Sequence, residues 1–184
     1  MSGHILIIDG GTTNLRLTLI GASGEVLAII KKDAGISQTN IDGHNGRLKS
    51  ALQDAIYSLM AKFCLAPSDI ALCAAYGMIT SREGLVEIPH QIAPTDADQL
   101  YSSMVIHAFP EIVPFPITFI PGVKNTDATV TVNTLSQMDM MRGEETEAIG
   151  LFQLVQPNRS CVFVLPGSHN KLVKMGAGDK LMAA

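Results

Sequence analysis

The sequence predicts an α/β domain built on a mixed sheet. Two continuous apolar runs, residues 5–8 and 70–76, have the composition of strands that are buried on both faces. Between them, apolar residues recur at three- and four-residue steps over about residues 47–64, which predicts an amphipathic helix. A strand, a long helix and a second strand in this order indicate a crossover between parallel strands.

The first apolar run also begins an antiparallel meander. A turn of glycines and threonines connects it to a second strand at residues 15–20. A further turn, Gly-Ala-Ser-Gly at residues 21–24, leads to a third strand at residues 26–31. A meander followed by strand–helix–strand units predicts a mixed sheet with crossover helices.

The remaining elements follow from local patterns. Residues 35–46 are predicted to be a polar loop, and residues 77–94 an irregular segment. Residues 95–98 resemble a capping box, in which Thr95 is the cap of a helix that runs to about residue 108. A third helix is predicted over residues 144–155. Further strands are predicted at residues 117–120, 129–132, 161–165 and 171–175.

Composition limits the classes of function. The net charge of −4, without basic clusters, argues against nucleic acid as a partner. No apolar run reaches about 18 residues, so a membrane span is not expected. The N-terminus lacks the pattern of a secretory signal. The three cysteines, Cys64, Cys73 and Cys161, lack metal-like spacing and are expected to be reduced, mostly buried thiols of a cytoplasmic protein.

The first candidate site is the turn at residues 9–16. Asp9 lies where the first buried strand ends, and Gly10 and Gly11 permit a tight turn with close approach of a ligand to the backbone. Such a turn can bind a phosphate while the acid holds a divalent metal. An ordinary hairpin turn is the alternative. The side chains that add donors to this turn are Thr12, Thr13, Asn14 and Arg16.

The second candidate site is the acidic sequence Met-Arg-Gly-Glu-Glu-Thr-Glu at residues 141–147. Acids in the first turn of a helix are favoured by the helix dipole alone. A carboxylate there, Glu144 or Glu145, can instead accept a proton from a substrate hydroxyl.

Two further segments carry polar side chains. Gly167, Ser168 and His169 form a small, donor-rich turn that suits a phosphate, although an ordinary polar turn is the alternative. In the irregular segment, Ser81 and Arg82 are candidates for substrate contact, because an arginine can clamp a carboxylate bidentately. An exposed loop arginine without a ligand is the alternative. Neither a GxxxxGK[ST] nor a GxGxxG sequence is present around residues 9–14.

Taken together, these segments resemble a known family. Residues 9–16, Asp-Gly-Gly-Thr-Thr-Asn-Leu-Arg, are similar to the first phosphate motif of the sugar-kinase branch of the actin/hexokinase/Hsp70 superfamily. Within that branch, residues 77–84, 141–146 and 165–171 resemble the 2-dehydro-3-deoxygalactonokinases of bacterial galactonate breakdown. The resemblance implies a ribonuclease H-like or actin-like ATPase domain.

The resemblance also implies a reaction: transfer of the ATP γ-phosphoryl group to the 6-hydroxyl of 2-dehydro-3-deoxy-D-galactonate. Asp9 would hold Mg²⁺ through water, and Glu144 would be the general base, with Glu145 as its rival. Arg82, with Ser81, would contact the sugar acid. The partners implied are ATP and a sugar acid, and a homo-oligomer is left open. The phosphates would be lined by Gly10, Gly11, Thr12, Thr13, Asn14, Arg16, Gly167, Ser168 and His169.

The sequence also departs from the family pattern. Leu172 stands where a tryptophan is expected, and Ser168 and Asn170 replace a threonine and a serine. The resemblance implies a second domain that carries the adenosine site, and most of that domain is expected to lie outside these 184 residues. Residues 1–158 are therefore expected to be the N-terminal, sugar-binding domain, and residues 159–184 the opening hairpin of a truncated nucleotide-binding domain. The alternatives are a truncated, non-catalytic sugar-acid-binding or interaction domain and an exopolyphosphatase-like hydrolase of the same superfamily.

Overall fold

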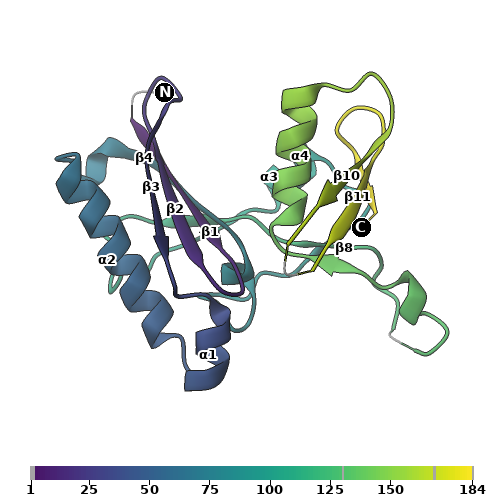
Figure 1. Ribbon diagram of the computed structural model, residues 1–184, viewed down its shortest axis with the longest axis horizontal. Helices are drawn as coiled ribbons and strands as arrows, with labels where there is room; N and C mark the ends of the chain where they lie inside the picture. The colour runs from purple at the N-terminus through teal and green to yellow at the C-terminus, as the bar shows by residue number, and fades with distance from the viewer. Residues whose placement is uncertain (1–2, 130, 168, 184) are drawn as a thin grey trace. The chain divides into compact units, whose positions relative to one another are not determined.

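The computed structural model describes residues 3–129, 131–167 and 169–183 (Figure 1). Internal contacts divide the chain into two compact units. Unit 1 comprises Met1–Ile88 and Val105–Phe119, and unit 2 comprises Pro89–Met104 and Ile120–Ala184. Each unit has its own apolar core, and each is described by itself.

Unit 1 is built on a mixed sheet, which has six strands among the described residues. The three N-terminal strands form the predicted antiparallel meander, and β1 pairs in parallel with β4 after the predicted crossover. In turn, β4 pairs in parallel with β7, and β6 pairs with β7 antiparallel. The strands, in sheet order, are β3 (Val26–Lys32), β2 (Leu15–Ile20), β1 (His4–Gly10), β4 (Ile70–Gly77), β7 (Ile117–Phe119) and β6 (Val105–His107).

The long crossover helix α2 (Gly46–Lys62) packs its apolar stripe against this sheet. Strand β2 alternates between buried leucines and more exposed residues such as Arg16, as expected for a strand with one face in the core. The helix residues that enter the core are Leu48, Leu52, Ala55, Ile56, Leu59 and Met60.

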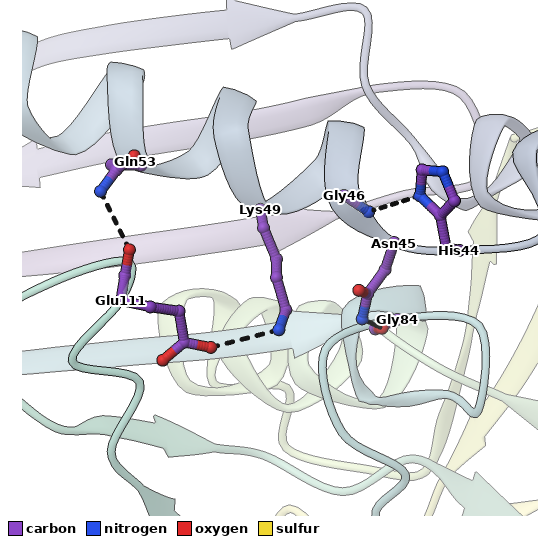
Figure 2. Close-up of polar contacts among 7 residues, drawn as sticks. All are labelled: His44, Asn45, Gly46, Lys49, Gln53, Gly84 and Glu111. Carbon is purple, nitrogen blue, oxygen red and sulfur yellow. Dashed lines mark hydrogen bonds and ion pairs between the residues drawn. The ribbon is translucent and has the colours of Figure 1, made fainter.

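Polar contacts tie the start of α2 to two loops (Figure 2). Lys49 Nζ lies 3.1 Å from Glu111 Oε1, and Gln53 Nε2 donates to the Glu111 carbonyl at 3.0 Å. Asn45 Nδ2 donates to the carbonyl of Gly84 at 2.9 Å. The last contact matters for the site, because Gly84 belongs to the loop that carries Arg82.

Unit 2 contains two small sheets and two α-helices among its described residues. One sheet joins β5 (Gln91–Ile92), β8 (Val123–Lys124) and β9 (Met140–Met141), and the other joins β10 (Cys161–Leu165), β11 (Lys171–Met175) and β12 (Leu181–Ala183). The helices are α3 (Ala97–Ser102) and α4 (Glu144–Val155). The shared core includes Leu100, Val123, Met141, Ile149, Phe152, Val173, Met175 and Leu181.

The residues after 158 therefore pack, within this chain, in the same core as α4. Val173 and Met175 of β11 are fully buried with Phe152 of that helix. The expectation that residues 159–184 open a separate domain stays a prediction.

The helix predicted over residues 95–108 is wrong in its second half. It ends at Ser102, and Val105–His107 forms the strand β6. The hydroxyls of Ser102 and Ser103 donate to carbonyls of the last turn, and β-branched residues then pair with β7. The cap is also one residue later than predicted, since Asp96 Oδ1 accepts the N–H of Gln99 at 2.9 Å.

The structure differs from three other local predictions. The polar loop at residues 35–46 contains a short helix, α1 (Ile36–Asp42), which ends at Gly43 with φ of 71°. Residues 129, 131 and 132 are not in a strand, and Val130 lies outside the described residues. Cys64 is exposed rather than buried, whereas Cys73 is buried and Cys161 is intermediate.

Candidate functional site

Asp9 and Arg16 face each other next to the turn of the first hairpin. They are register partners in the β1–β2 ladder, and Arg16 Nη1 lies 3.4 Å from Asp9 Oδ2. Burial raises the pKa of the Asp9 carboxyl, and the Arg16 guanidinium opposes that shift. The pair therefore places a carboxylate, with a quarter of its side chain exposed, beside the predicted phosphate turn.

Two glycines allow the ends of β1 and β4 to approach each other closely. A Cβ atom on Gly10 would lie 2.5 Å from the Cβ of Ile79. Gly77 has φ of 85°, and a Cβ atom there would lie 2.7 Å from the carbonyl oxygen of Gly10. Side chains at these two positions would push the strand ends apart. Close approach of β1 and β4 therefore requires glycine at both positions.

The turn at residues 11–14 is closed by one internal hydrogen bond, and its carbonyls accept three more from residues 35–37. The Gly11 N–H donates to the Asn14 carbonyl at 2.8 Å, so this amide serves the turn itself. The side chains of Thr12 and Thr13 are exposed. The carbonyls of residues 11, 12 and 13 accept N–H groups of residues 36, 37 and 35 at 3.3, 2.9 and 3.0 Å, respectively.

The loop after β4 brings one of its two candidate residues to the surface. Ser81 is 6% exposed and its hydroxyl donates to the Met78 carbonyl at 2.7 Å, so it stabilises the 3₁₀ turn Met78–Thr80. Arg82, in contrast, is exposed. Within the described part of the chain no ion pair involves its guanidinium. Arg82 is therefore the residue of the two whose side chain is available to a ligand.

In unit 2, the side chain of Glu145, the second residue of α4, accepts the backbone N–H at the start of that helix. Gly143, the N-cap of α4, has φ of 117°, and its N–H lies 2.9 and 2.8 Å from the two Glu145 carboxyl oxygens. Glu145 is fully buried, and Thr146 Oγ1 donates to it at 3.2 Å. Burial raises the pKa of Glu145 to about 7 against the opposing effect of these hydrogen bonds.

Glu144 occupies a different environment from its neighbour. Its side chain is partly exposed, and Oε2 accepts the backbone N–H of Arg142 at 3.1 Å. The Arg142 guanidinium in turn lies 3.3 Å from Nδ1 of His90. Burial, Arg142 and Lys124 lower the pKa of His90 to about 4, so the ring is neutral at pH 7. No local pattern indicates this contact, because His90 is 52 residues away from Arg142 in the chain.

The second predicted phosphate turn connects β10 with β11. Gly167 N–H donates weakly to Asn170 Oδ1 at 3.4 Å, and His169 and Asn170 are exposed. Ser168 lies outside the described residues. An ion pair between Lys171 and Asp139 holds the first residue of β11.

The structure thus groups the predicted residues into two sets. In unit 1, the turn at residues 9–16 lies next to the segment at residues 77–84, through the contact of Gly10 with Ile79. Unit 2 carries the acidic turn and the turn at residues 167–170. The residues that sequence reasoning missed are 35–37, whose backbone holds the first turn; they lie in a segment without regular periodicity.

Two kinds of feature are absent from the described residues. No helix in residues 3–129, 131–167 or 169–183 is long and apolar enough to cross a membrane. No group of three or more histidine, cysteine, aspartate or glutamate side chains that could hold a metal ion occurs in the same residues.

The chain is similar in sequence to a curated protein. It is 27% identical over 187 residues to the Rhizobium meliloti (strain 1021) protein named Probable 2-dehydro-3-deoxygalactonokinase DgoK1, covering 98% of this chain and 52% of that protein. The chain therefore spans about half the length of this curated relative.

Solved structures share the fold. A Sinorhizobium meliloti crystal structure, assigned provisionally as a 2-dehydro-3-deoxygalactonokinase, superposes with a TM-score of 0.74 at 22% identity, over 97% of this chain and 51% of that one. A reductive activator for a corrinoid, iron-sulfur protein gives 0.57 at 18% identity, over 97% and 30%. The predicted fold class is confirmed.

The sequence model of the 2-keto-3-deoxy-galactonokinase family matches residues 9–180. This match begins at Asp9 and includes the acidic turn and both glycine turns. The chain belongs to the 2-keto-3-deoxy-galactonokinase family.

Proposed function

We propose that this chain supplies the acceptor-activating residues and two phosphate-binding turns for ATP-dependent phosphorylation of 2-dehydro-3-deoxy-D-galactonate at its 6-hydroxyl. The observation that carries the proposal is the family match over residues 9–180, which includes every candidate segment. It is supported by the different environments of the two candidate bases. The alternatives, a non-catalytic sugar-acid-binding domain and an exopolyphosphatase-like hydrolase, are not favoured by that match.

Glu144 is the better candidate for the general base. A base must reach the proton of the substrate hydroxyl, and the Glu144 carboxylate is partly exposed while the Arg142 N–H holds one of its oxygens. Glu145 is fully buried, and both of its oxygens accept the Gly143 N–H. Glu145 therefore positions the turn. Glu144 accepts the proton of the 6-hydroxyl as its oxygen bonds to the γ-phosphorus, and the bond from that phosphorus to the β,γ-bridging oxygen breaks, so that ADP leaves.

Asp9 suits a magnesium ion of the kind that kinases use. Mg²⁺ keeps several waters and binds through one or two carboxylates together with substrate phosphates, so a full protein cage is not required. Asp9 offers one partly exposed carboxylate beside the turn at residues 10–14. When bound there, the ion supplies neutralisation of the phosphate charge.

The remaining candidate residues would bind and orient the two substrates. The first turn, with Arg16, would hold phosphate oxygens, and Gly167, Ser168 and His169 would form the second phosphate turn. Arg82 would clamp the carboxylate of the sugar acid, because its guanidinium is exposed on a loop that is fastened to α2 through Asn45 and Gly84. Such a site works by alignment of the two substrates.

The test is a coupled assay of the 184-residue chain with ATP and 2-dehydro-3-deoxy-D-galactonate, comparing Glu144→Gln with the control Glu87→Gln. Glu87 is exposed and lies outside the site. Loss of general-base catalysis predicts a fall in kcat of about 10²- to 10⁴-fold for Glu144→Gln, with the Kd for ATP unchanged. Near-normal turnover of that variant would remove Glu144 as the base. Sugar-acid binding without turnover would instead identify a binding domain, and polyphosphate hydrolysis a hydrolase.

A further inference from the structure

The backbone behind the first turn has a specific arrangement. The carbonyl groups of Gly11, Thr12 and Thr13 all accept hydrogen bonds from one short segment, residues 35–37 at the start of α1. The donors are the N–H groups of Ile36, Ser37 and Gly35, in that order. Three successive carbonyls are thus turned toward the same neighbour.

The direction of these three carbonyls also fixes the direction of the amides that follow them. In a trans peptide the C=O of one residue and the N–H of the next point in opposite directions. The one cis bond among the described residues is Ala93–Pro94. The N–H groups of Thr12, Thr13 and Asn14 must therefore point away from α1.

The amides of Thr12, Thr13 and Asn14 belong to two exposed residues and one half-buried residue. In residues 3–129, 131–167 and 169–183, no backbone carbonyl accepts a hydrogen bond from any of them. The side chains of Thr12 and Thr13 are exposed on this turn, and the Gly11 amide is already used by the Asn14 carbonyl. Successive backbone N–H groups that converge on one side form a concavity that binds anions.

We infer that residues 35–37 are positioning residues for this anion cradle: by holding three carbonyls on one side of the turn, they present the amides of residues 12–14 to a phosphate on the other. The inference rests on the proposed function in taking the phosphates of ATP as the anion. It assigns a role to a segment that contacts the phosphates only through the turn.

At Gly35, the segment at residues 35–37 lies too close to the turn at residues 11–13 for any side chain to fit between them. A Cβ atom at this position would lie 2.3 Å from the Thr12 carbonyl oxygen and 2.4 Å from its carbonyl carbon. No backbone can approach a side chain that closely, so Gly35→Ala must shift the turn relative to α1. Gly150, which lies in α4 and where an added Cβ would meet nothing within 4 Å, is a matched control for the same substitution.

Ser37 allows the hydrogen bond itself to be tested. Ser37→Pro removes the N–H that donates to Thr12, whereas Ser37→Ala keeps it. Proline is tolerated in the first turn of a helix, because the N–H groups there have no partner within the helix. The two variants therefore differ in one donor to the turn and in the backbone freedom of Ile36, because proline disfavours the helical conformation of the residue before it.

The experiment titrates the chain with Mg·ATP and with Mg·pyrophosphate and follows the backbone amide signals of Thr12, Thr13 and Asn14 by NMR. In the unsubstituted chain and in Ser37→Ala these signals shift, with equal Kd. In Ser37→Pro the Kd for both probes rises about fivefold, the effect of one hydrogen bond, while sugar-acid binding is unchanged. Gly35→Ala shows a larger rise, and Gly150→Ala shows none.

Three outcomes overturn the inference. They are equal Kd values for Ser37→Pro and Ser37→Ala, equal values for Gly35→Ala and Gly150→Ala, or no amide shift at residues 12–14 with either probe. If Ser37→Pro does not fold, the glycine pair decides. None of these results decides the proposed function, which the coupled assay tests separately. A chain that phosphorylates the sugar acid without these amide shifts would be a kinase whose phosphates bind elsewhere.

Discussion

Both carboxyl oxygens of Glu145 lie within 2.9 Å of the Gly143 backbone nitrogen, two residues earlier in the chain. This contact closes the first turn of α4 around a fully buried acid. The two adjacent glutamates have the same side chain, and this contact gives them different environments. Glu145 is a structural cap, and Glu144 keeps a partly exposed side chain.

The buried cap predicts a pH-dependent stability. Burial raises the pKa of Glu145 from 4.5 to about 7, so between those values the folded state holds a proton that the unfolded state has released. The free energy of unfolding should therefore fall as the pH rises from about 4.5 to 7, by on the order of 3 kcal/mol from this group. Urea denaturation of Glu145→Gln at several pH values should lack this component. Glu87→Gln should retain it, and parallel curves for both variants would contradict the assignment.

Arg16 is expected to tune Asp9. The guanidinium lowers the pKa of Asp9 against the effect of burial, so Arg16→Ala should raise that pKa further. Because the pair is partly exposed, the change in the free energy of unfolding should stay below about 1 kcal/mol. Carbon-13 NMR titration of the Asp9 carboxyl measures the shift, with Arg159→Ala, an exposed arginine elsewhere, as control. An unchanged Asp9 titration would show that the two groups do not interact in solution.

Gly77 is expected to tolerate no side chain. Its φ of 85° disfavours other residues, and a Cβ atom would collide with the Gly10 carbonyl at 2.7 Å. Gly77→Ala should lower the free energy of unfolding by about 2 kcal/mol or more. Gly150→Ala, in an open helical position, should leave it unchanged or raise it slightly. Equal denaturation midpoints for the two variants would mean that the strand ends are less constrained than the structure shows.

Arg82 is expected to act on the substrate and not on the fold. Since its side chain is exposed, Arg82→Ala should leave the denaturation midpoint unchanged. Loss of a charged clamp should raise the KM for the sugar acid about tenfold or more, with little change in the KM for ATP. Steady-state kinetics in the coupled assay, with Arg159→Ala as control, measure both constants. A sugar-acid KM equal to that of the control would exclude Arg82 from the site.

Local patterns predicted the elements that are long or strongly periodic. The runs at residues 5–8 and 70–76 form β1 and β4, and the stripe of α2 matches its predicted spacing. The two-residue strands β5, β8 and β9 were missed, because they exist only through pairing with distant segments. The strand β6 was assigned to a helix for the same reason.

What the sequence alone determined is therefore the fold class, the meander, the crossover and the chemical inventory of the turns, since these depend on periodicity and residue type. Only the tertiary structure decided which glutamate is buried and which N–H groups hold the turn at residues 11–13. Glu144 and Glu145 are adjacent on one helix, so the packing of that helix decides which of the two is buried. The contact between Thr12 and Ser37 joins residues 25 positions apart, and no local propensity encodes such a distance.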